Sequence, residues 1–168
     1  MFVIDSTLRG RLAIVPRPRG GDWLPSEVGC LKADGVDVVA SLLETREAAE
    51  LGLADEACAC AANGIDFVSV PVPDRGVPGS TKAFLAVAED LRNRLAQGSS
   101  VGIHCRACIG RAAMLAVVVL VLAGDRLEDA WARVEQARCI PVPDTDEQRR
   151  WVESLVAARV DPRSTDRS

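Results

Sequence analysis

Short apolar segments rich in β-branched residues alternate along this chain with longer segments of helical periodicity. Such alternation favours a mostly parallel sheet that is covered by helices on both faces. Strands are expected at residues 2–8, 12–15, 36–43, 67–72 and 101–104, the first two forming a hairpin. Helices are expected at residues 25–33, 44–51, 54–62, 81–97, 110–123, 125–138 and 145–160. The pattern therefore predicts an α/β fold whose central, mostly parallel sheet has about five strands, with helices on both faces.

The chain length of 168 residues fits one ordinary domain. No internal repeat and no linker divides it, so residues 1–160 are expected to form a single domain. Residues 161–168 contain no apolar residue and are expected to be a disordered tail.

The net charge of −4 argues against a protein that coats nucleic acid, because such proteins are normally basic. An anionic substrate remains compatible with it, since a local cationic pocket can coexist with an acidic surface. The longest apolar run, residues 112–123, is too short to span a bilayer, and the first residues lack the apolar core of a signal peptide. We expect a cytoplasmic protein with no nucleic-acid partner and no membrane partner.

The cysteines are not spaced as a disulfide framework, and the chain is too long to need one. The only histidine is His104, and the two close cysteine pairs, at 58/60 and 105/108, do not give a usual zinc-site pattern. We therefore expect reduced thiols, no metal ion and no cofactor. Four of the cysteines are expected to be small core residues: Cys30, Cys58, Cys60 and Cys139.

The chemistry is concentrated where the strand at 101–104 ends. Cys105 follows this strand, and Arg111 comes six residues later, at the start of the next helix. The backbone N–H groups between them can curl around one centre, which also faces a helix N-terminus, a natural anion site. The positive electric field of these N–H groups and of the helix N-terminus lowers the pKa of a cysteine and makes it a thiolate. The planar fork of Arg111 suits two phosphoryl oxygens at once. In a chain so rich in arginine the bare spacing is weak, and the strand–loop–helix context supplies the specificity.

A candidate acid, Asp74, lies upstream in the segment Pro71–Pro78. A thiolate that attacks a phosphate monoester expels an oxyanion, and an aspartic acid on a loop can protonate that oxygen. By residue type alone, the same segment is also a good β-turn. Its combination with Cys105 favours the general acid.

These motifs resemble the cysteine-dependent protein tyrosine phosphatases. His-Cys-x5-Arg at 104–111 is similar to their signature, and Pro-Asp-Arg-Gly-Val-Pro at 73–78 to the general-acid loop of the dual-specificity branch. The likeness covers roughly residues 36–155 and implies a dual-specificity phosphatase-like fold. It implies a phosphomonoester hydrolase that works through a phosphocysteine on a phosphorylated protein or a small phosphomonoester. In that reading Cys105 is the nucleophile, Arg111 the phosphate ligand and Asp74 the general acid. The resemblance gives the phosphate-binding amides to Arg106, Ala107, Cys108, Ile109, Gly110 and Arg111.

Two further residues have supporting roles in the resemblance. His104 would order the loop and tune the thiol, although an ordinary buried histidine is equally compatible with its position. Gln148 resembles the glutamine that positions the hydrolytic water in some members. Thr145-x-x-Gln148 also has the pattern of a helix capping box, and this reading is favoured on the sequence.

Two positions depart from the family pattern. Cys108 stands where the family has glycine, and a cysteine with positive φ there would be destabilised by about 1–2 kcal/mol. Ala112 stands where the family has a hydroxyl that helps the cysteine sulfur leave the phosphoenzyme. Without this hydroxyl we predict slow breakdown of the phosphocysteine, and both departures keep open a catalytically weak or inactive module that binds phosphate or phosphoprotein. Cys105-x-x-Cys108 also allows a regulatory disulfide. The same pair allows a thiol–disulfide redox protein, but that function would leave Arg111 and Asp74 without a task.

Overall fold

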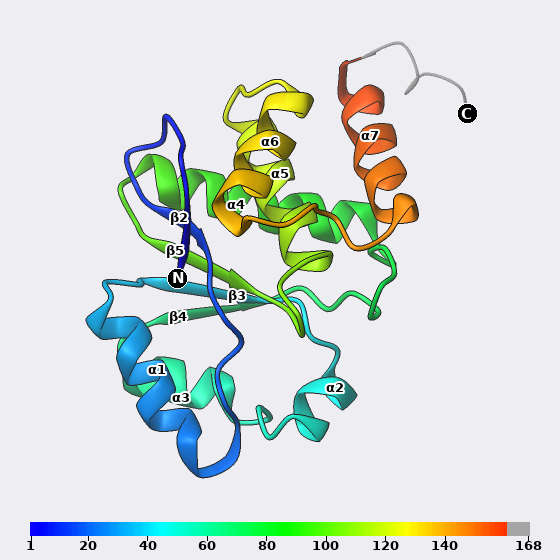
Figure 1. Cartoon of the computed structure of the whole chain (residues 1–168). Coiled ribbons are helices and arrows are strands. Elements are labelled where there is room, and N and C mark those ends of the chain that lie inside the picture. Colours follow the sequence, from blue (N-terminus) through cyan, green and yellow to red (C-terminus); the bar gives the residue numbers. More distant parts are fainter. Residues whose placement is uncertain (161–168) are drawn as a thin grey trace.

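The structure, a computed structural model, describes residues 1–160 (Figure 1). The tail expected at residues 161–168 lies outside the described residues. Five strands form one sheet in the order β1-β2-β5-β3-β4. They are β1 (Phe2–Ile4), β2 (Leu12–Ile14), β3 (Val38–Ser41), β4 (Asp66–Ser69) and β5 (Val101–His104). Only the β1–β2 pair is antiparallel, so the expectation of a mostly parallel sheet is confirmed.

Helices cover both faces of this sheet, as the alternation predicts (Figure 1). One face carries α1 (Leu24–Ala33), α2 (Thr45–Glu50) and α3 (Glu56–Ala62). The other carries α4 (Thr81–Ala96), α5 (Arg111–Leu122), α6 (Leu127–Arg138) and α7 (Asp146–Val160). A short 3₁₀ turn at Gly21–Trp23 leads into α1. No helix within residues 1–160 has the length and apolar character needed to cross a bilayer.

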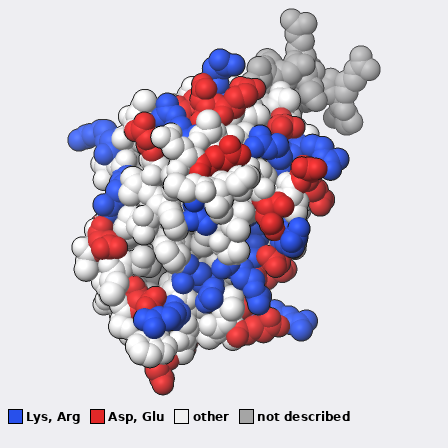
Figure 2. Space-filling model, in the orientation of Figure 1, with Lys and Arg blue, Asp and Glu red and all other residues white. Residues whose placement is uncertain are grey.

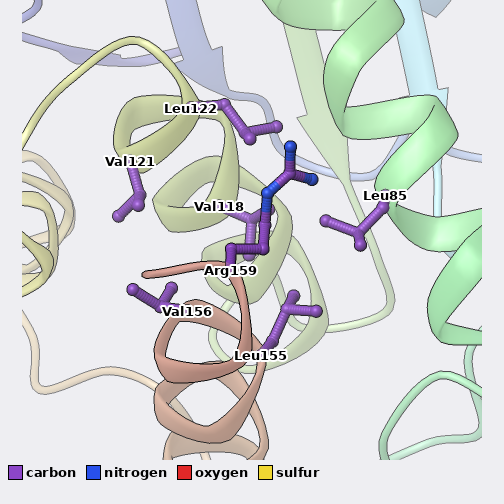
Figure 3. A pocket seen from close by; sticks show the side chains of 7 residues that line it. All are labelled: Leu85, Val118, Val121, Leu122, Leu155, Val156 and Arg159. Atoms are coloured by element: carbon purple, nitrogen blue, oxygen red, sulfur yellow. The ribbon is translucent and has the colours of Figure 1, made fainter. Parts of the chain in front are cut away.

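Helix α5 is the centre of the core. Its first ten residues are all buried, because α4, α6 and α7 surround it and the sheet closes its remaining side. A helix that is covered on all sides needs no polar face, which explains why its sequence after Arg111 is apolar throughout. Near its end an apolar cavity of about 170 Å³ remains between α4, α5 and α7, with Arg159 as its one charged side chain (Figure 3).

Three of the four cysteines expected in the core are exposed instead. Cys30 and Cys58 lie on the outer faces of α1 and α3, and Cys139 follows α6, while only Cys60 is buried. The expectation for Cys30, Cys58 and Cys139 was wrong because short helices here bury only one stripe of residues. A small apolar side chain does not reveal which stripe it belongs to.

The carboxyl ends of the parallel strands meet at one edge of the sheet. Ser41, at the end of β3, pairs in register with His104, at the end of β5, and with Ser69, at the end of β4. The segments that follow these three strands are therefore neighbours in space. They carry Glu47, the loop from Pro71 to Pro78, and Cys105.

Candidate active site

The segment between β5 and α5 forms a tight loop around the sulfur of Cys105. The N–H of Cys108 donates a hydrogen bond to Cys105 Sγ over 3.2 Å. The pKa of Cys105 is lowered to about 6, first by a hydrogen bond from the Cys108 side chain and then by the Ala112 N–H and the charge of Arg111, against the opposing effect of burial. Cys105 is therefore mostly a thiolate at neutral pH.

The thiol of Cys108 has one proton and three acceptors. Its Sγ lies 3.2 Å from the carbonyl oxygen of Val15 and 3.6 Å from the carbonyl oxygen of Cys105, and the sulfur of Cys105 is the third acceptor. The hydrogen bond to Cys105 and, after it, burial raise the pKa of Cys108, so this group stays protonated. Once Cys105 is ionised, the thiolate is the stronger acceptor, because hydrogen bonds to charged groups are the stronger ones.

Cys108 has the backbone conformation that suits the glycine of the family pattern. Its φ is 58°, in the left-handed region. Arg138 Nε donates to the Cys108 carbonyl over 2.9 Å, and the Arg138 guanidinium lies over the ring of Phe2. These contacts hold the loop in a conformation that a non-glycine residue disfavours.

Arg111 is the first residue of α5, and its side chain is only 2% exposed. Its guanidinium makes a bidentate pair with Glu47 of α2, at 2.7 and 2.9 Å, and donates to the carbonyl of Val72 over 3.0 Å. The hydrogen bonds from Arg111 lower the pKa of Glu47, so the carboxylate stays charged. Sequence reasoning missed Glu47. A buried arginine needs an acidic partner, but the spacing along the chain does not say which acid supplies it.

Asp74 contacts the same guanidinium, at the Nη2 that also donates to Glu47. Its Oδ1 accepts a hydrogen bond from Arg111 Nη2 over 2.7 Å, while its side chain remains 55% exposed. The next residue, Arg75, has a φ of 58° and lies 3.6 Å from Asp144, which follows α6. The loop that carries Asp74 is thus held over the phosphate-binding loop by ion pairs on both of its sides.

Gln148 contacts both the start of its own helix and the loop that carries Asp74. Its backbone N–H donates to the Thr145 hydroxyl over 3.2 Å, as in a capped helix. Its side chain does not complete the capping box, because its Nε2 donates to the carbonyl of Gly76 over 3.0 Å. A Cβ on Gly110 would stand 2.4 Å from Gln148 Oε1, so a larger residue there would have to shift the end of the Gln148 side chain. Gln148 thus faces both the acid loop and the phosphate-binding loop.

These groups enclose a cavity of only about 20 Å³. It is lined by Asp74, Arg75, Cys105, Ala107, Ile109, Gly110, Arg111, Asp144 and Gln148. That volume suffices for about one water molecule. A phosphoryl group is larger, so this cavity could hold one only if the carboxylate of Asp74 moved away from Arg111.

Arg106 and His104 lie outside this cavity. The side chain of Arg106 is about half exposed and lies 3.6 Å from Glu47. His104 is fully buried, and its Nε2 lies 2.9 Å from Oε1 of Glu56, the first residue of α3. His104 therefore anchors the end of β5 to the helices of the opposite face of the sheet.

Positive charge gathers near the site despite the negative net charge. Figure 2 shows Lys and Arg side chains grouped in the lower half of this face, between the segment after β2 and helix α2. Arg17 and Arg46 belong to these segments. Within residues 1–160 no three His, Cys, Asp or Glu side chains are grouped as metal ligands would be.

A comparison with known families matches residues 17–125, more than half of the chain, to the Tc-R-P family, described as "Polymorphic toxin system, DSP-PTPase phosphatase". No curated protein matches the chain by sequence.

Solved structures share the fold at low identity. Kinase associated phosphatase (KAP), crystallised with its catalytic-site cysteine changed to serine, has a TM-score of 0.76 at 16% identity, over 89% of this chain and 86% of its own. Tk-PTP in its active form has a TM-score of 0.72 at 24% identity, over 92% and 96%. Human DUSP28 has a TM-score of 0.64 at 17% identity, over 88% and 93%. The expected dual-specificity phosphatase-like fold is confirmed.

Proposed function

The chain belongs to the Tc-R-P family of DSP-PTPase phosphatases of polymorphic toxin systems, and from this premise we propose that it hydrolyses phosphomonoesters through a phosphocysteine on Cys105. The observation that carries the proposal is the meeting of three groups around one cavity. These are a thiolate at Cys105, a buried guanidinium at Arg111 and a carboxyl group at Asp74. A nucleophile, a phosphate ligand and a proton donor are the minimum that this reaction needs.

In the first step, the thiolate of Cys105 attacks phosphorus. The S–P bond forms as the P–O bond to the leaving group breaks, and Asp74 transfers its proton to the departing oxygen. The amides of residues 106–111 and the guanidinium of Arg111 hold the equatorial oxygens, where charge accumulates. Glu47 keeps Arg111 in place because its two oxygens occupy the guanidinium edge away from the substrate.

In the second step, water attacks the phosphocysteine. Asp74, now a carboxylate, takes a proton from the water, and the S–P bond breaks to release phosphate and the thiolate of Cys105. The amide of Gln148, which lines the cavity, is within reach to orient that water. Ala112 supplies no hydroxyl to the leaving sulfur, so the thiol of Cys108 is the side-chain donor left beside it.

The hydrolysis of para-nitrophenyl phosphate tests the proposal. Wild type, Cys105→Ser and Asp74→Asn are compared at equal concentration. Turnover that is lost with Cys105→Ser and reduced with Asp74→Asn supports the phosphatase. Turnover that survives Cys105→Ser contradicts it. The natural substrate is proposed to be a phosphorylated protein or a small phosphomonoester.

The closed cavity and Ala112 favour a second candidate, a module that binds phosphate without efficient turnover. Binding of a phosphopeptide or orthovanadate with no product would support that candidate. A thiol–disulfide redox role ranks behind both, because it gives no task to Arg111 and Asp74. Since a reactive thiolate requires a reducing compartment, we propose that the protein acts in cytoplasm.

A further inference from the structure

A second cavity lies behind the phosphate-binding loop, on the opposite face of the sheet. It has a volume of about 220 Å³ and lies between the ends of β3 and β4 and the helices α2 and α3. A dry cavity of about 150 Å³ is already large enough to bind benzene. This space can therefore hold a small organic molecule.

The walls of this cavity are mostly apolar. Leu43, Leu53 and Phe67 supply large side chains, and the alanines of α2 and α3 supply the rest. Hydroxyl groups from Ser41, Thr45 and Ser69 are spaced around the wall. A ligand with an apolar body and few polar groups fits such walls.

One charged side chain, that of Glu56, also lines the cavity. Glu56 is 2% exposed, and within residues 1–160 its carboxylate has no Lys or Arg nitrogen within salt-bridge distance. Its contact is His104 Nε2 at 2.9 Å, and the contact lacks the alignment of a hydrogen bond. Burial, and after it the negative charge of Glu56, raise the pKa of Cys60, one turn further along α3, to about 12.

A buried carboxylate without a full positive partner is unfavourable, and a cation placed beside it relieves that cost. We propose that this cavity binds a small organic cation with an apolar body, an aryl- or alkylammonium, whose nitrogen pairs with Glu56. The apolar part of the ligand lies against Leu43, Leu53 and Phe67, and the hydroxyl groups take the remaining N–H donors.

The position of the cavity couples it to the active site. Helix α2 contributes Thr45, Ala48 and Ala49 to the wall, and from the same helix Glu47 holds Arg111. Helix α3 contributes Glu56, which contacts His104, the residue before the nucleophile. A cation that draws Glu56 toward itself changes the contact between Glu56 and His104. Occupancy of the cavity therefore changes the reactivity of Cys105.

Binding is tested with benzylammonium and with benzyl alcohol, a neutral molecule of similar size. Backbone amide chemical shifts are followed during titration of each. We expect saturable shifts centred on residues 41–57 and 67–69, and an affinity for the ammonium about ten-fold or more above that for the alcohol. Equal affinities, or no saturable shift at these residues, would overturn the proposal.

Substitutions distinguish an effect of the Glu56 carboxylate from an effect on folding. Glu56→Gln should weaken benzylammonium binding about ten-fold or more, and Glu50→Gln, an exposed acid on α2, should leave it unchanged. Ala57→Leu fills the cavity from an exposed helical position while keeping Glu56, so it should abolish binding in a protein that still folds. Undiminished binding by either Glu56→Gln or Ala57→Leu would contradict the assignment.

The coupling is read from the rate at which iodoacetamide alkylates Cys105. Saturating benzylammonium should change this rate in wild type and leave it unchanged in Ala57→Leu. An unchanged rate in wild type would overturn the coupling. The coupling rests on the proposed role of Cys105. The binding of benzylammonium does not rest on it, because Cys105→Ser protein should bind benzylammonium as wild type does. A protein without phosphatase activity that still binds the cation would refute the proposed function alone.

Discussion

The carboxylate of Asp74 lies 2.7 Å from the guanidinium of Arg111. The candidate general acid therefore binds the same guanidinium that a phosphoryl group would need. In the proposed mechanism Asp74 therefore has two opposed effects. It would compete with phosphate for Arg111 in the ground state and would supply a proton in the reaction.

Asp74→Asn separates these effects. Removal of the negative charge should leave the affinity for orthovanadate unchanged or raise it, because the amide competes less well for Arg111. The same change should lower kcat by about 10²–10⁴-fold, since the leaving oxygen loses its proton donor. Steady-state kinetics and vanadate inhibition measure both quantities. An undiminished kcat would contradict the role of Asp74.

The pKa of Cys105 predicts how its reactivity depends on pH. Because this pKa is lowered to about 6, the thiolate fraction and the alkylation rate should rise through about pH 6 and level off above pH 7. Cys108→Ala removes the largest cause of the shift, so its midpoint should move to higher pH. Cys60→Ala is the matched control, because Cys60 lies on α3 and does not line the catalytic cavity. A wild-type midpoint at the usual pH of a free cysteine would contradict the loop geometry.

Glu47→Gln tests the support of Arg111. A glutamine cannot balance the buried guanidinium, and breaking a buried ion pair typically destabilises a protein by about 3–5 kcal/mol. We expect a loss of stability of that order in urea unfolding, together with weaker vanadate binding. Glu50→Gln, three residues further along α2 and exposed, should change neither. Unaltered vanadate binding by Glu47→Gln would show that Arg111 needs no such support.

Ala112 predicts an accumulating intermediate. Without a hydroxyl beside the sulfur, breakdown of the phosphocysteine should be slower than its formation. Rapid mixing with para-nitrophenyl phosphate should then show a burst of product equal to the enzyme concentration, followed by a slow steady rate. Ala112→Ser should raise the steady rate. A linear trace from wild type, with no burst, would refute this explanation.

The loop between β5 and α5 could be predicted from the sequence because its determinants are local. Cys105, the loop and Arg111 are contiguous, and the strand before and the helix after them have clear patterns. The positive φ of Cys108 follows from the same register. Glu47 and Glu56 could not be predicted, because each meets its partner only after β3 and β5 pair side by side. Ordinary exposed acids have the same residue type and the same helical context.

The strand boundaries show the same limit. The apolar run at 36–43 predicts a longer strand than β3, since Val36 is apolar but its N–H bonds to Leu31 at the end of α1. The run at 67–72 likewise predicts strand through Val72, whose carbonyl instead accepts from Arg111. An apolar pattern indicates that a segment is buried. It does not decide between strand and loop, because the hydrogen-bond partner that decides this lies elsewhere in the chain.

The central claim is that Cys105 carries the phosphoryl group during turnover. Wild-type enzyme mixed with para-nitrophenyl phosphate and quenched in acid during the burst should yield one phosphorylated peptide by mass spectrometry, with the phosphate on Cys105. Cys105→Ser, treated in the same way, should show no turnover, and Cys108→Ser should still be labelled at Cys105. Phosphate on any other residue, or product release by Cys105→Ser, would contradict the account.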